Sequence, residues 1–397
     1  MKSKPGTEYF IYFNVTTTEP EPLIPVGHEI AYEQFRLPIE PGERTFATGG
    51  PALKVSAEGN ELTASSSKVN FVFDKKTGLV SSYKVGGTEY FKDGFGLQPN
   101  FWRAPNDNDY GNGNPKRLQV WKQSSKNFNV VDANIVMDGK DAVLTANYLL
   151  AAGNLYIVTY RISPSGVVKA DFTFTSTDME AAKTEASEAT LMATFTPGSD
   201  AARKAASKLE VPRIGVRFRL PAEMNQVEYF GRGPEENYID RNAGTLIDLY
   251  KTTADQMYFP YVRPQENGHH TDTRWLTLNK KGGKGLTIYA DKTIGFNALR
   301  NSVEDFDGEE TISRPYQWLN RDAGELVHDE SKAKDQLPRK THINDITPRN
   351  FVEVCVDMKQ QGVAGYNSWV HVRNRVTIFR QTKNTNGDSQ SYQDKLT

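Results

Sequence analysis

The sequence predicts an all-β fold built around one large antiparallel sandwich. Stretches of alternating apolar and polar residues recur along most of the chain, separated by turn residues at intervals of about eight to twelve positions. Aromatic residues make up 11% of the chain, a content typical of strand-rich folds. The strand patterns do not alternate with long helical patterns, which excludes a parallel α/β architecture.

Length and charge narrow the class of protein further. The 397 residues can bury a large core and suggest two or three domains, although an all-β sandwich can exceed about 200 residues as one domain. With 48 basic and 49 acidic residues the net charge is -1, so the chain lacks the positive field of a nucleic-acid binder. The single cysteine, Cys355, stands in an apolar run and is predicted to lie in the core, and it allows no intrachain disulfide.

The N-terminal residues contain no apolar signal segment, and no run of about eighteen apolar residues occurs anywhere. We therefore expect neither an export signal nor a membrane partner in the chain as given. Periplasm and cytoplasm both stay open as compartments.

The chain begins with two predicted strands, residues 8–15 and 28–37, joined by a proline-rich loop. An isolated hairpin is only marginally stable in water, so this segment either docks on the later part of the chain or belonged to a larger sandwich. We favour the second interpretation. Residues 1–48 are then a partial β-sandwich with a linker rich in Pro and Gly.

From Ala52 onward the pattern becomes that of a β-meander and a large sandwich. Strands are predicted at residues 53–57, 61–65, 69–73, 79–85, 127–137, 142–150, 155–162, 167–175, 214–220, 226–230, 273–278, 285–290 and 351–357. Two surface insertions break the rhythm: residues 181–209, with a short helix expected at 200–209 and capped by Asp200, and the charged, loop-like residues 305–340. The polar tail, residues 381–397, is predicted to be disordered.

Residues 101–111 form the densest polar segment, Phe-Trp-Arg-Ala-Pro-Asn-Asp-Asn-Asp-Tyr-Gly, and are predicted to be a rigid loop without regular structure. Pro105 fixes its own φ, and the Asn and Asp side chains hydrogen-bond the nearby backbone. Such a loop either connects two strands or presents side chains to a ligand.

Two further segments, residues 229–240 and 257–270, bring ionisable, amide and aromatic side chains together beside Gly and Pro. Sugar recognition needs this mixture, because carboxylates and amides bond vicinal hydroxyls and aromatic faces cover the C–H faces of the ring. A pair of loops held by buried polar networks explains the same composition, and the residues alone leave both interpretations open.

The motifs at residues 101–109 (FWRAPNDND), 231–238 (GRGPEENY), 260–268 (PYVRPQENG) and 367–369 (NSW) stand in an order that resembles the last domain of family 2 glycoside hydrolases of the β-galactosidase type. Residues 27–35 (GHEIAYEQF) resemble the end of the immunoglobulin-like domain that precedes it. The resemblance implies a galactose-mutarotase-like supersandwich over residues 49–380, preceded by a remnant of an immunoglobulin-like β-sandwich over residues 1–48.

In that family the two catalytic glutamates belong to a TIM barrel N-terminal to the matched region. The resemblance therefore implies no catalytic residue here, an inactive isolated chain, and no cofactor of its own, since any divalent cation belongs with the missing barrel. Its implied role is carbohydrate binding at the wall of a β-galactosidase active site, with a galactoside and the missing barrel and N-terminal domains as partners. A homo-oligomer stays open. The implied substrate-binding residues are Trp369, Asp109, Asn112, Arg103, Glu236, Asn237, Glu266 and His269.

Four alternatives apply to these segments. Residues 107–111 have the alternating oxygens of a calcium loop, but Leu118 stands where a calcium-binding glutamate is expected. Glu266 with His269 or His270 could act as the acid and base of an aldose mutarotase, although neighbouring strand residues point to opposite faces. No third ligand completes a zinc site at these histidines. A purely structural or assembly role is the remaining alternative.

Overall fold

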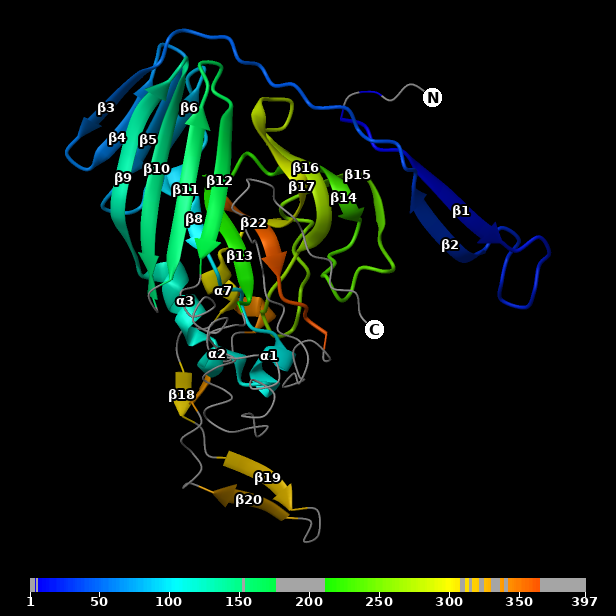
Figure 1. The fold of residues 1–397 in the computed structure, drawn as a ribbon. Coiled ribbons are helices and arrows are strands. Elements are labelled where there is room, and N and C mark those ends of the chain that lie inside the picture. Colours follow the sequence, from blue (N-terminus) through cyan, green and yellow to red (C-terminus); the bar gives the residue numbers. More distant parts are fainter. Residues whose placement is uncertain are drawn as a thin grey trace, which may run out of the picture. The chain divides into compact units, whose positions relative to one another are not determined.

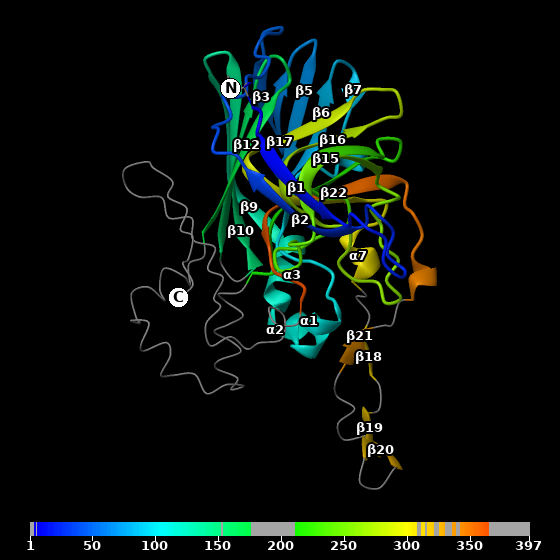
Figure 2. The same ribbon diagram turned by 90° about the vertical axis from the view of Figure 1, so that its right-hand side faces the viewer.

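The computed structural model describes residues 4, 6–151, 154–175, 211–307, 311–313, 316–320, 325–329, 336–338 and 342–364. The chain divides into two compact units, Met1–Gly50 and Pro51–Thr397. The described residues are mainly antiparallel β-sheet, which confirms the predicted all-β class (Figures 1 and 2). None of their helices is long and apolar enough to cross a membrane.

The first unit contains one antiparallel hairpin, formed by β1 (Phe10–Thr16) and β2 (Glu29–Arg36). Strand alternation and the pairing register place Ile11, Phe13 and Phe35 on the same face. Their exposed fractions are 41%, 54% and 55%. A two-stranded sheet buries too little apolar area to be stable alone, and whether this unit is part of a larger sandwich stays a prediction.

Three sheets form the second unit, with strand orders β3-β4-β5-β6-β7, β12-β11-β10-β9 and β15-β14-β16-β17-β22-β13-β8. The strands are β3 (Lys54–Glu58), β4 (Glu61–Ser65), β5 (Val69–Asp74), β6 (Leu79–Val85), β7 (Thr88–Glu89), β8 (Gln98–Asn100), β9 (Phe128–Asp138), β10 (Asp141–Leu150), β11 (Leu155–Ile162), β12 (Val168–Thr175), β13 (Arg213–Pro221), β14 (Gln226–Gly233), β15 (Leu246–Thr253), β16 (His270–Asn279), β17 (Gly285–Leu299) and β22 (Phe351–Gln360).

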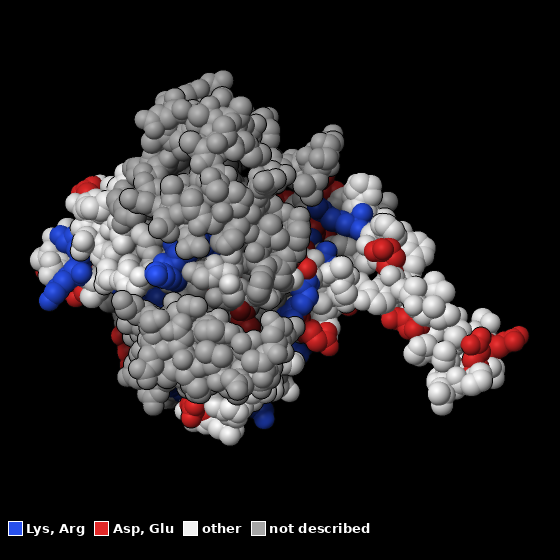
Figure 3. All heavy atoms as spheres, turned by 90° about the horizontal axis from the view of Figure 1, so that it is seen from below, with Lys and Arg blue, Asp and Glu red and all other residues white. Residues whose placement is uncertain are grey.

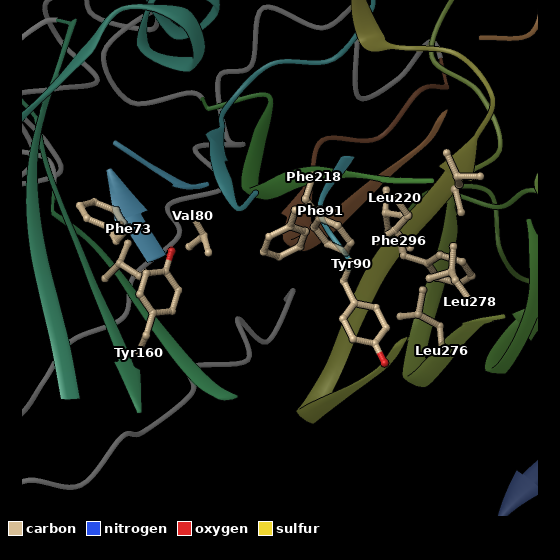
Figure 4. Close-up of a cluster of buried hydrophobic side chains, with 14 of the residues drawn as sticks. Phe73, Val80, Tyr90, Phe91, Tyr160, Phe218, Leu220, Leu276, Leu278 and Phe296 are labelled. Atoms are coloured by element: carbon tan, nitrogen blue, oxygen red, sulfur yellow. The ribbon is translucent and has the colours of Figure 1, made fainter. Parts of the chain in front are cut away.

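The core lies between these sheets and is rich in aromatic rings. Along β10 every second side chain is buried, as the period of a strand requires. Tyr148 from β10 meets Phe73 from β5 with ring centroids 6.4 Å apart, so the four- and five-stranded sheets pack face to face. Phe91 meets Phe218 of β13 at 5.6 Å and continues the core to the seven-stranded sheet (Figure 4). Cys355 is buried, as predicted.

The polar segment 101–111 departs from its prediction in one respect. Phe101 and Trp102 are buried, but Asp107–Gly111 form a short helix, α1, where no regular structure was expected. The Asn106 side chain accepts from the Asp109 amide at 2.8 Å, and the Asp109 carboxylate accepts from the Asn106 amide at 3.1 Å. The reason is that Asn and Asp, which favour turns, are also among the best helix caps.

Other helices and strands were also not expected. α2 (Asn114–Arg117) and α3 (Gln119–Lys126) follow α1 (Figure 1). Trp121 is buried and anchors α3 in the core. Residues 305–340 were predicted to be loop-like, but the structure contains helix and strands there. These are α7 (Val303–Phe306), the pair β18 (Thr311–Ser313) and β21 (Gln336–Pro338), and the pair β19 (Tyr316–Asn320) and β20 (Glu325–Asp329); the remaining short helices are η1 (Lys92–Gly94) and η4 (Ile343–Asp345). The predicted helix at residues 200–209, the tail 381–397 and Trp369 lie outside the described residues.

Candidate functional site

A pocket of about 320 Å³ opens in the second unit where the three polar segments of the sequence meet. The first segment contributes α1 and its cap, the second contributes the turn after β14, and the third contributes the loop before β16. The residues after β22 complete the lining. The lining residues are Asn106, Asp107, Asn108, Tyr238, Arg241, Tyr261, Gln265, Glu266, Val363 and Ala364.

Glu266 is the best-defined polar group of this pocket. Only 4% of the residue is exposed. Its Oε1 accepts from Arg213 Nη2 at 2.6 Å and from Asn297 Nδ2 at 3.4 Å, and its backbone amide donates to Ala104 O at 3.1 Å. Among the described residues, Oε2 has no hydrogen-bond partner. The carboxylate is thus fixed on one side, and its other oxygen is a free acceptor at the pocket.

A buried charge cluster lies behind Glu266. Arg213 is fully buried, and its Nε is 3.1 Å from Asp357 Oδ1. His269 Nδ1 is 3.7 Å from Asp357 Oδ2. Burial raises the pKa of Asp357 to about 7, although the Arg213 charge opposes this shift. Burial and, second, the Arg213 charge hold the pKa of His269 well below its usual value. His269 is therefore part of this cluster and does not line the pocket.

Glu236 and Asn237 hold the pocket loops in place. The Glu236 carboxylate accepts from Arg241 Nη2 at 2.7 Å, from the Gly268 amide at 2.8 Å, and from the Tyr261 hydroxyl. Asn237 is fully buried and bonds Thr271 and two backbone carbonyls. Glu236 thus positions two lining residues, Arg241 and Tyr261, whereas Asn237 fixes the turn after β14 to the start of β16.

Arg103 and Asp109 form a buried ion pair, with Arg103 Nη2 at 3.0 and 3.1 Å from the two carboxylate oxygens. Asn112 is the C-cap of α1, and its Nδ2 donates to Asn114 Oδ1 at 3.1 Å. None of these three residues lines the pocket. Of the residues predicted to bind substrate, the structure brings Glu266 to the pocket, places the others described here around it, and does not describe Trp369.

The sequence interpretation missed several residues of the site. Arg241 follows directly after the second polar segment, so a slightly longer segment would have included it. Gln265 lies within the third segment, next to Glu266, but was not chosen as a binding residue. Asp357 was taken as the last residue of the predicted strand 351–357, and Arg213 stood just before the predicted strand 214–220. A charged residue at the end of an apolar strand was their one signal, since buried charges require partners.

No group of three or more His, Cys, Asp or Glu side chains in the described part of the chain could hold a metal ion. At the candidate calcium segment, Asp109 is occupied by Arg103, and Asp107 lies 2.6 Å from Arg263 Nη1. These ion pairs explain the acidic residues of α1 without a cation.

The fold and the pocket define a large antiparallel β-sandwich domain with a polar recess. The family model described as β-galactosidase small chain matches residues 65–384. The chain belongs to this family and corresponds to a C-terminal region of β-galactosidase, which confirms the resemblance of the motifs.

Three β-galactosidases illustrate the relationship. The protein of Priestia megaterium is 29% identical over 345 residues, 86% of this chain and 27% of that protein. The protein of Kluyveromyces lactis is 30% identical over 272 residues, 67% of this chain and 24% of that protein. The protein of Halalkalibacterium halodurans is 24% identical over 366 residues, 91% of this chain and 30% of that protein. The chain thus spans 24–30% of the length of these three relatives.

Proposed function

We propose that the pocket beside Glu266 recognises a galactoside and completes the active-site wall of a β-galactosidase that hydrolyses terminal β-galactosides. The observation that carries the proposal is the Glu266 carboxylate, buried and fixed by Arg213, with its Oε2 free at the pocket. A fixed carboxylate oxygen is a strong acceptor for a sugar hydroxyl, because hydrogen bonds to a charged group are stronger than neutral ones.

The other lining groups fit a neutral sugar. Gln265 and Asn108 offer amides, and Tyr238 and Tyr261 offer aromatic rings. The charged groups are compensated within the protein: Arg241 pairs with Glu236, and Glu266 pairs with Arg213. On the described surface seen in Figure 3, basic and acidic side chains are likewise interspersed. Nothing in this balance favours a charged ligand.

Retaining glycosidases use two carboxyl groups about 5–5.5 Å apart, one as acid and base and one as nucleophile. We assign neither role to this chain and place both in a TIM barrel that the chain would join, together with any divalent cation. The isolated chain should then bind sugar without hydrolysing it. A purely structural role would instead require that the polar residues leave no cleft, and the open pocket supports recognition.

The test is calorimetric or NMR titration of the chain with lactose and with galactose. We expect weak binding, with a Kd in the millimolar range, because a pocket of this kind meets one face of the sugar. Glu266→Gln should weaken binding by about tenfold, since it replaces the charged acceptor. Glu228→Gln is the matched control, because Glu228 lies on β14 outside the pocket and pairs with Lys251 of β15.

Equal affinities of Glu266→Gln and the unmutated chain would contradict the proposal, as would no binding at all. Thermal unfolding of each variant separates a lost contact from a lost fold. Hydrolysis of a nitrophenyl β-galactoside by the chain alone, above background in a preparation free of other glycosidases, would contradict the assignment of catalysis to a barrel.

A further inference from the structure

The segment that follows β22, residues 361–364, is held mainly by side chains from distant parts of the chain. Val363 and Ala364 form one side of the pocket. The partners come from the first polar segment and from the end of the second. Irregular backbone next to a cavity needs such partners, because unpaired peptide groups are costly to bury.

Asp240 holds this segment through hydrogen bonds to its backbone amides. Its Oδ1 accepts from the Val363 amide at 3.1 Å, and its Oδ2 accepts from the Ala364 amide at 2.9 Å. Gly362 lies so close that a Cβ added there would be 2.1 Å from Asp240 Oδ2. Only glycine allows the carboxylate to approach the two consecutive amides in this way. Asp240 itself does not line the pocket.

Side chains of the first polar segment hold residues 361–363 through hydrogen bonds to their backbone carbonyls. Arg103 donates to the carbonyls of Gln361 and Gly362, the latter at 2.9 Å. Asn106 and Asn108 both donate to the Val363 carbonyl, at 3.2 and 2.9 Å. The segment is thereby fixed on both sides, and it is fixed to α1, which forms another side of the pocket.

From this geometry we infer that Asp240 is a positioning residue of the pocket. It sets the place of Val363 and Ala364 relative to Glu266, and with it the width of the recess that a sugar ring must enter. It also fixes the point from which the chain continues toward Trp369. The effect on sugar binding rests on the proposed function, but the hydrogen bonds from Asp240 to the backbone can be tested without sugar.

The hydrogen bonds of Asp240 to Val363 and Ala364 are tested by amide hydrogen exchange in the chain. Asp240→Ala should lower the protection of the Val363 and Ala364 amides by at least about tenfold, because two charge-assisted bonds are lost. Asp240→Asn keeps one acceptor oxygen and should give an intermediate loss. Asp248→Ala is the matched control, because Asp248 is exposed on β15 and its carboxylate bonds the neighbouring Leu249 amide. Unchanged protection in Asp240→Ala overturns the inference.

A double-mutant cycle gives a second test, of the contact between Asp240 and Gly362. Gly362→Ala should reduce protection in the unmutated background, because the new methyl group meets the Asp240 carboxylate. In the Asp240→Ala background the same substitution should have at least about fivefold less effect, since contacting residues are not additive. Additive effects contradict the contact.

The consequence for binding is measured as lactose affinity, with thermal unfolding as a check on folding. Asp240→Ala should weaken lactose binding by about fivefold or more, Asp240→Asn less, and Asp248→Ala not at all. Loss of protection with full affinity overturns the positioning role. If the unmutated chain binds no lactose, the proposed function fails, whereas exchange and the cycle still decide whether Asp240 fixes the segment.

Discussion

Two clusters of buried and half-buried arginine and carboxylate side chains are centred on the same pair of strands, β13 and β22, and differ in how fully their charges are matched. In the cluster of Arg217, the guanidinium bonds Glu304 at 2.7 Å and Glu353 at 3.3 Å. Arg219 adds a second bond to Glu353, at 2.8 Å. Two arginines thus meet two glutamates, although Arg217 Nε makes no hydrogen bond within the described residues.

The cluster of Arg213 has one arginine for two carboxylates, Glu266 and Asp357, with His269 beside them. Several of its buried atoms make no hydrogen bond within the described residues. These are Arg213 Nε and Nη1, His269 Nδ1 and both carboxylate oxygens of Asp357. Burial and, opposing it, the Arg213 charge leave the pKa of Asp357 raised to about 7, as expected for a carboxyl group in a cluster that is short of positive charge.

The difference follows the position of the two clusters. The matched cluster binds α7 to the sheet, whereas the unmatched cluster ends at the pocket through Glu266. Natural proteins tolerate incomplete polar satisfaction mainly where a site needs it. The first cluster therefore ties α7 to the sheet. Under the proposed function, the second cluster holds the Glu266 carboxylate in place as the acceptor for a sugar hydroxyl.

The largest effect is expected from Arg217→Met, which breaks the matched cluster. Glu353 is 2% exposed and would lose part of its compensation, so the free energy of unfolding should fall by about 3–5 kcal/mol. Urea unfolding measures the loss. Arg161→Met is the control, because Arg161 forms exposed ion pairs with Asp138 and Asp141 and should have little effect. Equal stabilities of the two variants would refute the structural role of the Arg217 cluster.

A smaller, pH-dependent effect is expected from Asp357→Asn. Asp357 binds its proton more tightly in the folded protein than in the unfolded chain, so its contribution to stability falls as pH rises from about 4 to about 7. Relative to Asp357→Asn, the unmutated chain should lose about 2–4 kcal/mol over this range and then level off. His269 has the opposite slope, because its folded pKa is lowered, but it is present in both proteins.

Unfolding curves at several pH values, with Asp248→Asn as the exposed control, measure the difference. Parallel pH profiles for the unmutated chain and Asp357→Asn would contradict a raised pKa of Asp357 in the folded protein.

The sequence predicted the strands of the second unit well where alternation was clear. β10 was expected at residues 142–150 and spans Asp141–Leu150, because its apolar side chains alternate with polar ones. β15 was missed, since Leu246–Thr253 mixes exposed and half-buried positions without a regular period. α1 was taken for a loop because the residues that cap a helix and those that build turns are the same.

Within the site, Glu266 was predicted from its motif, but its position depends on Arg213, 53 residues earlier in the chain. A contact of this range is set by the pairing of β13 with β22 and by the loop before β16, and one sequence does not reveal it. The same holds for Asp240, whose partners Val363 and Ala364 lie more than a hundred residues away.

The smallest effect is expected from Arg219→Lys in the matched cluster. The Arg219 guanidinium lies 4.3 Å from the ring centroids of both Phe95 and Phe351 while it bonds Glu353. Lysine keeps the charge but loses the planar stacking, so unfolding should become about 1 kcal/mol easier. Lactose affinity should not change, because Arg219 does not line the pocket. A change in affinity without a change in stability would mean that the two clusters are coupled through β22, and the division of the clusters between fold and site would be wrong.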